Sequence, residues 1–203
     1  TVTVNCVNPA QDDRAGTVGK PLPYHTFALP ETDEHGIGEL YVTGPSVMLG
    51  YLGDPEATAE TLVKTEDGTV WVKTGDLASF EDGYVVLHGR LKRLIKVSGI
   101  SVFPSEVEHV LQDVEGVEDL VCFSMPHPYK QQVVEAAVVA SEEDFASLVK
   151  KLQAKAKQEL MYHARPVRYH RYDAFPRTAV GKVDVPQLQE DAAQKPAETS
   201  ETT

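Results

Sequence analysis

Asp76, Arg90 and Lys182 each follow a glycine, and each is a residue type that can bind part of a nucleotide. The carboxylate of Asp76 can accept two hydrogen bonds from the vicinal hydroxyls of a ribose. The planar guanidinium of Arg90 suits ribose and phosphate oxygens better than an ammonium does. Lys182 offers a compact positive charge. Each residue also has a simpler interpretation. Asp76 would then be a turn residue, Arg90 part of a surface ion pair, and Lys182 an ordinary loop lysine.

These residues belong to motifs that occur in a fixed order along the chain. The motifs are Gly38-Glu39-Leu40 with Gly50-Tyr51, Thr74-Gly75-Asp76-Leu77, Gly89-Arg90-Leu91-Lys92 through Gly99, and Pro176-Arg177-Thr178 with Gly181-Lys182-Val183-Asp184. A single triplet would be weak support, but ordered motifs with compatible spacing are specific. Together they resemble the signature of adenylate-forming enzymes, which include acyl-CoA and aryl-CoA synthetases, beetle-type luciferases and the adenylation domains of peptide synthetases. The resemblance covers about residues 17–188 and is closest to the C-terminal portion of fatty-acyl-CoA ligases among the AMP-forming acyl-CoA synthetases.

The resemblance implies a role for each charged residue. Lys182 is expected to lie between the substrate carboxylate and the α-phosphate of ATP, because the attack of one anion on another needs a cation between them. A positioned charge also stabilises the charge that develops in the transition state. Asp76 becomes the ribose clamp, and Arg90 becomes a ribose and phosphate contact.

The segment after Arg90 resembles the hinge of these enzymes. Lys92 stands where relatives pivot between an adenylate-forming and a thioester-forming orientation, and a hinge needs only a few residues. Lys96, Ser98 and Gly99 resemble the loop that reaches the nucleotide and lines the pantetheine channel, where glycine permits close backbone approach. The alternative for this cluster is a solvated basic turn.

Patterning predicts an α+β chain with a boundary near residue 91. Residues 18–90 alternate short apolar runs with turn signals, which is typical of strands, and one helix is expected from Asp54 to about Lys64. After this boundary, strands and helices alternate as in a small α/β lobe. By resemblance, residues 1–90 are the strand-rich end of a larger AMP-binding N-terminal domain with a distorted β-barrel. Residues 91–190 are a mobile C-terminal lobe, and the polar residues 191–203 are a disordered tail.

The elements expected in the lobe follow from periodicity and capping. Glu106 and Glu108, near the start of the first helix, are expected to interact with its macrodipole rather than to act as paired catalytic carboxylates. The expected elements are a helix from Pro104 to Gly116, strands over Leu120–Phe123 and Val133–Ala140, a helix over Ser141–Tyr162, and a strand over Val167–Tyr172.

Composition excludes several classes of protein. A formal charge of -12 and a pI near 5.0 argue against binding to nucleic acid through phosphate neutralisation. Cys6 and Cys122 lie far apart, and the histidines have no metal-ligand spacing, so neither a disulfide framework nor a metal site is expected. No apolar run is long enough to span a bilayer. A cytoplasmic location is expected, with peripheral attachment to a membrane as an alternative.

The resulting hypothesis is an ATP-dependent ligase that activates a carboxylic acid, first of all a medium- or long-chain fatty acid, and transfers it to coenzyme A. The resemblance implies ATP, AMP and Mg²⁺, with the Mg²⁺ ligands upstream of this chain. The phosphate loop of the family is absent and the chain begins at Thr1, so we expect a fragment that is inactive alone and needs the N-terminal part of the enzyme. The alternatives are an enzyme that loads a carrier protein, and a truncated, non-catalytic AMP- or partner-binding chain.

Overall fold

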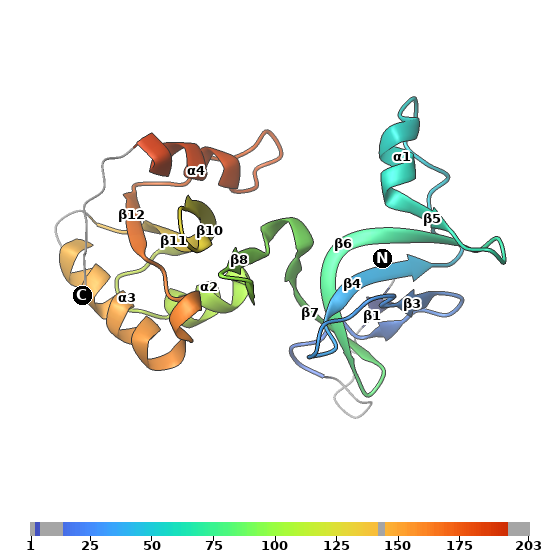
Figure 1. Ribbon diagram of the computed structural model, residues 1–203, viewed down its shortest axis with the longest axis horizontal. Helices are drawn as coiled ribbons and strands as arrows, with labels where there is room; N and C mark the ends of the chain where they lie inside the picture. Colours follow the sequence, from blue (N-terminus) through green and yellow to red (C-terminus); the bar gives the residue numbers. More distant parts are fainter. Residues whose placement is uncertain (1–2, 5–13, 142–144, 195–203) are drawn as a thin grey trace. The chain divides into compact units, whose positions relative to one another are not determined.

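The computed structural model describes residues 3–4, 14–141 and 145–194 (Figure 1). The chain separates into two compact units, Thr1–Lys92 and Arg93–Thr203. Both units contain strands and helices, so the α+β fold class predicted from the sequence is confirmed.

The first unit is built on a five-stranded antiparallel sheet in the order β3-β4-β6-β5, with β7 also paired to β6. The long strand β6 organises this sheet, because β5 pairs with its first half and β7 with its second half. The strands are β1 (Thr3–Val4), β2 (Lys20–Pro21), β3 (Thr26–Ala28), β4 (Gly38–Thr43), β5 (Leu62–Lys64), β6 (Val70–Glu81) and β7 (Tyr84–Arg90).

This sheet is open, whereas the resemblance led us to expect a distorted barrel. Within residues 14–92 its pairing does not return to its starting strand, because β5 and β7 share β6, and the other edge of β7 makes only an isolated bridge between Val85 and Gly19. The core is correspondingly small. It contains Leu40, Val42, Ala78 and Val85, with Val18, Phe27 and Leu29 packed against it.

Helix α1 (Pro55–Thr61) begins as expected and ends earlier. The carboxylate of Asp54 accepts a hydrogen bond from Ala57 N–H at 2.9 Å, which satisfies one of the free donors of the first turn. The helix stops before Leu62 because the next residues pair with β6 as strand β5. Gly50 is needed nearby, since a Cβ there would lie 2.9 Å from the Cγ2 atom of Thr58.

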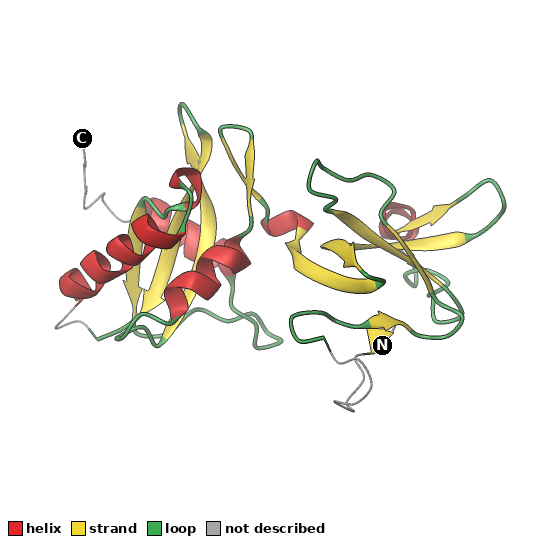
Figure 2. Ribbon diagram, turned by 90° about the horizontal axis from the view of Figure 1, so that it is seen from below, coloured by secondary structure: helices red, strands yellow, loops and turns green. Residues whose placement is uncertain are grey.

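The second unit has helices packed against both faces of a mixed sheet (Figure 2). Strand β11 is central, with β10 antiparallel on one side and β12 parallel on the other. The hairpin β8–β9 joins the start of β11. The elements are β8 (Ile95–Val97), β9 (Ile100–Val102), α2 (Pro104–Gln112), β10 (Asp119–His127), β11 (Gln131–Val139), α3 (Phe145–Glu159), β12 (Arg168–Tyr172) and α4 (Val185–Gln194), with 3-10 turns η1 (Leu91–Arg93) and η2 (Tyr162–Ala164).

Strand β11 is apolar along most of its length because its side chains alternate between two cores. Val134, Ala136 and Val138 face the cluster that contains α2 and α3 residues. Ala137 and Val139 face a second cluster, which α4 completes. The sheet is therefore a buried middle layer.

The helix α4 is the main element that the sequence patterns did not predict. Leu188 and Ala192, one turn apart, are fully buried in the second cluster, which holds the helix on the sheet. The tail was expected from residue 191, but α4 continues to Gln194, and residues 195–203 lie outside the described part of the chain. The helix expected over Ser141–Tyr162 is observed as Phe145–Glu159, Ser141 is not helical, and residues 142–144 of the expected first turn are likewise outside the described residues.

Candidate functional site

A bulge in β6 presents Asp76 at the point where β4 and β7 flank the strand. The Thr74 hydroxyl donates to the carbonyl of Leu40 at 2.8 Å and accepts the Asp76 N–H at 3.0 Å. The carboxylate of Glu39 accepts the N–H of Gly75 at 3.0 Å. Gly75 has a φ of 70°, a left-handed conformation that glycine adopts without strain. These contacts fix the backbone that carries Asp76.

Asp76 and Arg90 are direct register partners on β6 and β7, and their side chains form an ion pair. The Arg90 Nε atom lies 2.7 Å from Asp76 Oδ1, and the two side chains are 62% and 26% exposed. An exposed pair of this kind contributes at most about 1 kcal/mol to stability. Both groups remain accessible to a ligand, and together they present carboxylate acceptors and guanidinium donors, the groups that bind ribose hydroxyls and phosphate oxygens.

Lys96, Ser98 and Gly99 lie on the hairpin β8–β9. Val97 and Ile100 are register partners, so Ser98 and Gly99 form the two-residue turn. Their φ values of 52° and 85° are both positive, as a type I′ hairpin turn requires. The Lys96 Nζ atom lies 2.6 Å from the Ser101 hydroxyl. The expected loop is thus an ordered hairpin tip with Lys96, Ser98 and Gly99 exposed.

Lys182 is exposed on a closed loop of the second unit. Thr178 N–H donates to the Lys182 carbonyl, and Gly181 N–H donates to the Thr178 carbonyl, both at 2.8 Å. The Arg177 guanidinium donates to the Gly181 carbonyl at 2.9 Å. Arg177 and Val183 also form a β-bridge that closes the loop. The loop backbone is therefore fixed on both sides of the lysine.

The structure thus arranges the predicted residues in three groups. Asp76 and Arg90 meet in the first unit, and Lys92 is the last residue of that unit. The hairpin residues and the Lys182 loop are separate features of the second unit.

A partly buried ion pair near the start of the second unit corrects the role expected for Glu108. Its Oε1 atom lies 2.5 Å from Arg93 Nη2 and accepts the Cys122 N–H at 2.9 Å. Arg93 also donates to the Cys122 carbonyl at 3.1 Å. Glu108 therefore links α2 to β10 through the Cys122 N–H and pairs with Arg93, and these contacts replace the expected interaction with the helix macrodipole. Burial raises the pKa of the Cys122 thiol well above its usual value, so Cys122 is unsuited to act as a nucleophile.

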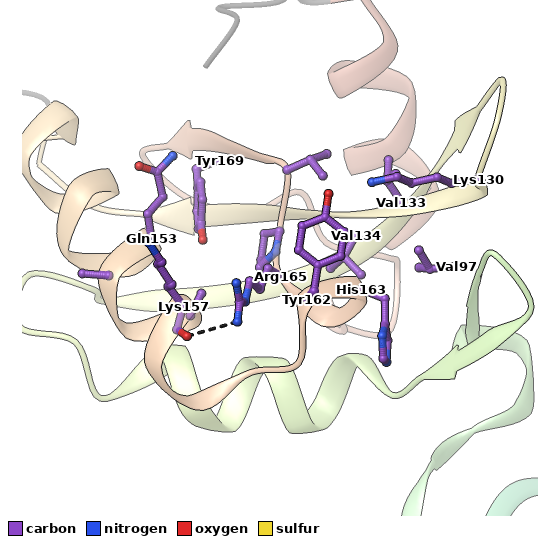
Figure 3. Close-up of a pocket in the computed structure, with 14 residues that line it drawn as sticks. Val97, Lys130, Val133, Val134, Gln153, Lys157, Tyr162, His163, Arg165 and Tyr169 are labelled. Carbon is purple, nitrogen blue, oxygen red and sulfur yellow. Dashed lines mark hydrogen bonds between the residues drawn. The ribbon is translucent and has the colours of Figure 1, made fainter. Parts of the chain in front are cut away.

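A cavity of about 530 Å³ lies in the second unit between α3, β11 and the η2 segment (Figure 3). Two of its cationic side chains, Arg165 and Lys130, already have partners. Arg165 donates to the carbonyls of Leu160 and Lys157 at 3.0 and 3.1 Å, which satisfies free acceptors at the end of α3. Lys130 Nζ lies 5.0 Å from the centre of the Tyr162 ring. No motif in the sequence predicted this cavity, because its lining comes from separate elements.

Within the part of the chain that the structure describes, no group of three or more His, Cys, Asp and Glu side chains could hold a metal ion. No helix among the described residues is long and apolar enough to cross a membrane.

The chain is similar to adenylate-forming ligases over most of its length. Residues 106–182 match the AMP-binding enzyme C-terminal domain family. The fatty acid–[acyl-carrier-protein] ligase MmaC of Mycobacterium marinum is 34% identical over 86% of this chain and 36% of its own length. The long-chain-fatty-acid–CoA ligase of Salmonella typhimurium is 33% identical over 93% of this chain and 34% of its own length.

A solved structure shows the same fold. The ATP-bound MatB from Rhodopseudomonas palustris superposes with a TM-score of 0.76 and 30% identity, over 92% of this chain and 38% of that protein. The chain spans about a third of the length of the curated relatives described above.

Proposed function

The chain belongs to the adenylate-forming ligases and carries their AMP-binding enzyme C-terminal domain, and on this premise we propose that it is the C-terminal part of an ATP-dependent acyl-CoA synthetase. The observation that carries the proposal is the Asp76–Arg90 pair, which is accessible and held by a hydrogen-bonded bulge. Such an arrangement adds little stability but suits a ribose.

The proposed reaction has two steps. First, a carboxylate oxygen of the acid attacks the α-phosphorus of ATP, the bond to the β-phosphate oxygen breaks, and pyrophosphate leaves. Second, a thiol sulfur attacks the carbonyl carbon of the acyl-adenylate, the thiol loses its proton, and AMP leaves with the electrons of the broken C–O bond. Lys182 acts in the first step by offsetting the repulsion between the two anions. Asp76 and Arg90 hold the ribose in both steps.

In the second step, the backbone of the Lys96–Gly99 tip lies beside the acyl-adenylate and the incoming thiol. Lys92 allows the second unit to change orientation between the steps. The contacts on either side of Lys92 support this role. Arg90 is paired within the first unit and Arg93 within the second, so only Leu91 and Lys92 lie between the two anchors.

Mg²⁺ would accompany ATP, and its ligands would come from outside the described residues. A cytoplasmic location and a substrate among medium- or long-chain fatty acids complete the proposal. Coenzyme A is the acceptor we favour. The relatives include ligases named for carrier proteins as well as for CoA, so a carrier protein is the competing acceptor.

The test is acid-dependent exchange of labelled pyrophosphate into ATP by the full-length protein, with carboxylic acids of increasing chain length. We expect exchange with fatty acids, followed by thioester formation when CoA is added. Thioester formation only with a phosphopantetheinylated carrier protein would identify the competing acceptor. If no carboxylic acid supports exchange, the chain is part of a non-catalytic protein.

A further inference from the structure

The tip of the β8–β9 hairpin contacts a turn at the start of β11, formed by Lys130, Gln131 and Gln132. Only one register pair, Gln131 with Val97, joins β8 to β11. Two hydrogen bonds from the hairpin backbone supplement it. Lys96 N–H donates to the side-chain Oε1 of Gln132 at 2.8 Å, and Ser98 N–H donates to the carbonyl of Lys130 at 2.9 Å. One side chain and one carbonyl, together with this register pair, therefore hold the tip beside β11.

The turn that provides both acceptors is strained. Gln132 N–H donates to the Lys130 carbonyl at 2.8 Å, which closes a three-residue γ-turn around Gln131. The φ of Gln131 is 65°, and γ-turns with a positive φ are rare and strained. Strain of this kind persists only where surrounding contacts impose it. Here the turn directs the Lys130 carbonyl at Ser98 while the next residue, Gln132, reaches Lys96.

We propose that Gln132 is a positioning residue for the acyl-transfer step. This inference rests on the proposed function, in which the Lys96–Gly99 backbone lies beside the acyl-adenylate and the thiol. Gln132 would not touch either reactant. It would hold the Lys96 amide, and with it the tip, in the geometry that the step needs, because a displacement of about 1 Å at a reacting centre can cost roughly 100-fold in rate.

The hairpin base would survive the loss of this hydrogen bond. Ile95, Val97 and Val102 are buried in the core cluster formed with α2 and α3, and they hold the two strands independently of Gln132. Replacing Gln132 should therefore change the tip without unfolding the unit. A merely structural role would lower both half-reactions equally, whereas a positioning role lowers acyl transfer alone.

The experiment compares Gln132→Leu, Gln132→Glu and Gln158→Ala in the full-length protein, with adenylate formation and acyl transfer from preformed acyl-adenylate measured separately. Leucine removes the acceptor, glutamate keeps one, and Gln158 is an exposed glutamine on α3 that serves as the matched control. We expect Gln132→Leu to lower kcat for acyl transfer roughly 10- to 100-fold, with the KM for the thiol and adenylate formation near wild type. Gln132→Glu and Gln158→Ala should stay near wild type.

Amide hydrogen exchange of this chain provides the structural control. In Gln132→Leu, Lys96 N–H should exchange at least about tenfold faster, while amides of the β10–β11 ladder keep their protection. Equal losses in both half-reactions, unchanged acyl transfer, or no rescue by glutamate would overturn the inference. A wild-type protein that forms no adenylate would instead overturn the proposed function, and this inference with it.

Discussion

Arg90 reaches across from β7 to place its Nε atom 2.7 Å from the Oδ1 atom of Asp76, its register partner on β6. The Arg90 guanidinium therefore contacts one carboxylate oxygen of Asp76. The Asp76 side chain is still 26% exposed, which leaves room for a ligand. The simpler interpretations of these residues, a surface ion pair for Arg90 and a turn residue for Asp76, agree only in part with the structure. Arg90 does form a surface ion pair, but Asp76 lies in a strand, and the residue that makes the bulge turn is Gly75.

Asp76→Ala should weaken ATP binding and slow both half-reactions in the full-length protein. Hydrogen bonds to a charged group contribute about 1.5–3 kcal/mol, which corresponds to roughly 10- to 100-fold in affinity. The preference for ATP over 2′-deoxy-ATP should also shrink, because the mutant no longer contacts that hydroxyl. Equilibrium binding of both nucleotides measures this effect, with the exposed Glu60→Ala on α1 as a control. An unchanged preference in Asp76→Ala would mean that Asp76 has no role in ribose binding.

Lys182→Ala should lower adenylate formation about 10²- to 10³-fold, because a preorganised charge is lost at the site of the developing transition state. Acyl transfer from supplied acyl-adenylate should be spared. The loop should keep its shape, since its bonds use the backbone carbonyl of residue 182 and the Arg177 side chain. Pyrophosphate exchange measures the first step, and the exposed Lys150→Ala on α3 is the matched control. Exchange near the wild-type rate in Lys182→Ala would exclude the assigned role.

The sequence predicted the elements whose pattern is local. Pro55 after Asp54 marked the start of α1, and the apolar residues of β11 marked a buried strand. The motifs also predict roles for Asp76, Arg90 and Lys182 from residue type and spacing, and these roles stay predictions. The ion pair of Asp76 with Arg90, however, depends on the register of two strands joined by a hairpin, which the motifs do not encode.

The missed features depend on contacts between distant segments. Helix α4 has a short amphipathic pattern in a polar region, and only burial of Leu188 and Ala192 on the sheet explains it. The contact between Gln132 and Lys96 joins residues that are 36 positions apart. A glutamine pair at 131–132 gives no local signal for a strained turn, since glutamine rarely adopts a positive φ.

Gln131→Gly should stabilise the protein by about 1 kcal/mol, because a residue with a Cβ pays roughly 1–2 kcal/mol in the left-handed region and glycine does not, while the more flexible unfolded chain offsets part of the gain. For a unit of this size, the midpoint of thermal unfolding should rise by a few degrees. The control is Gln158→Gly in the last turn of α3, where the same substitution should destabilise the protein, by less than the about 1 kcal/mol that glycine costs in a helix interior. Urea unfolding of this chain measures both changes. If Gln131→Gly instead lowers the free energy of unfolding, the positive φ of Gln131 does not destabilise the folded state.

The last prediction concerns the two residues between the anchors of the units. Arg90 is fixed to Asp76 in the first unit, and Arg93 is fixed to Glu108 and to the Cys122 carbonyl in the second. Lys92 lies between them in the 3-10 turn Leu91–Arg93 and is exposed. A change of orientation must therefore be absorbed by the backbone of Leu91 and Lys92.

Lys92→Pro should retain adenylate formation but lose acyl transfer in the full-length protein. Proline fixes its own φ near -65° and disfavours a helical conformation at the preceding residue, so the backbone at 91 and 92 loses one of the two conformations that the steps require. Lys92→Ala removes the charge and keeps the backbone free, so it should support both steps and separates a hinge from a basic contact. Single-turnover assays of each step decide the matter. Equal losses in both steps, accompanied by a lower unfolding midpoint, would indicate a folding defect, and full activity in both steps would locate the pivot away from Lys92.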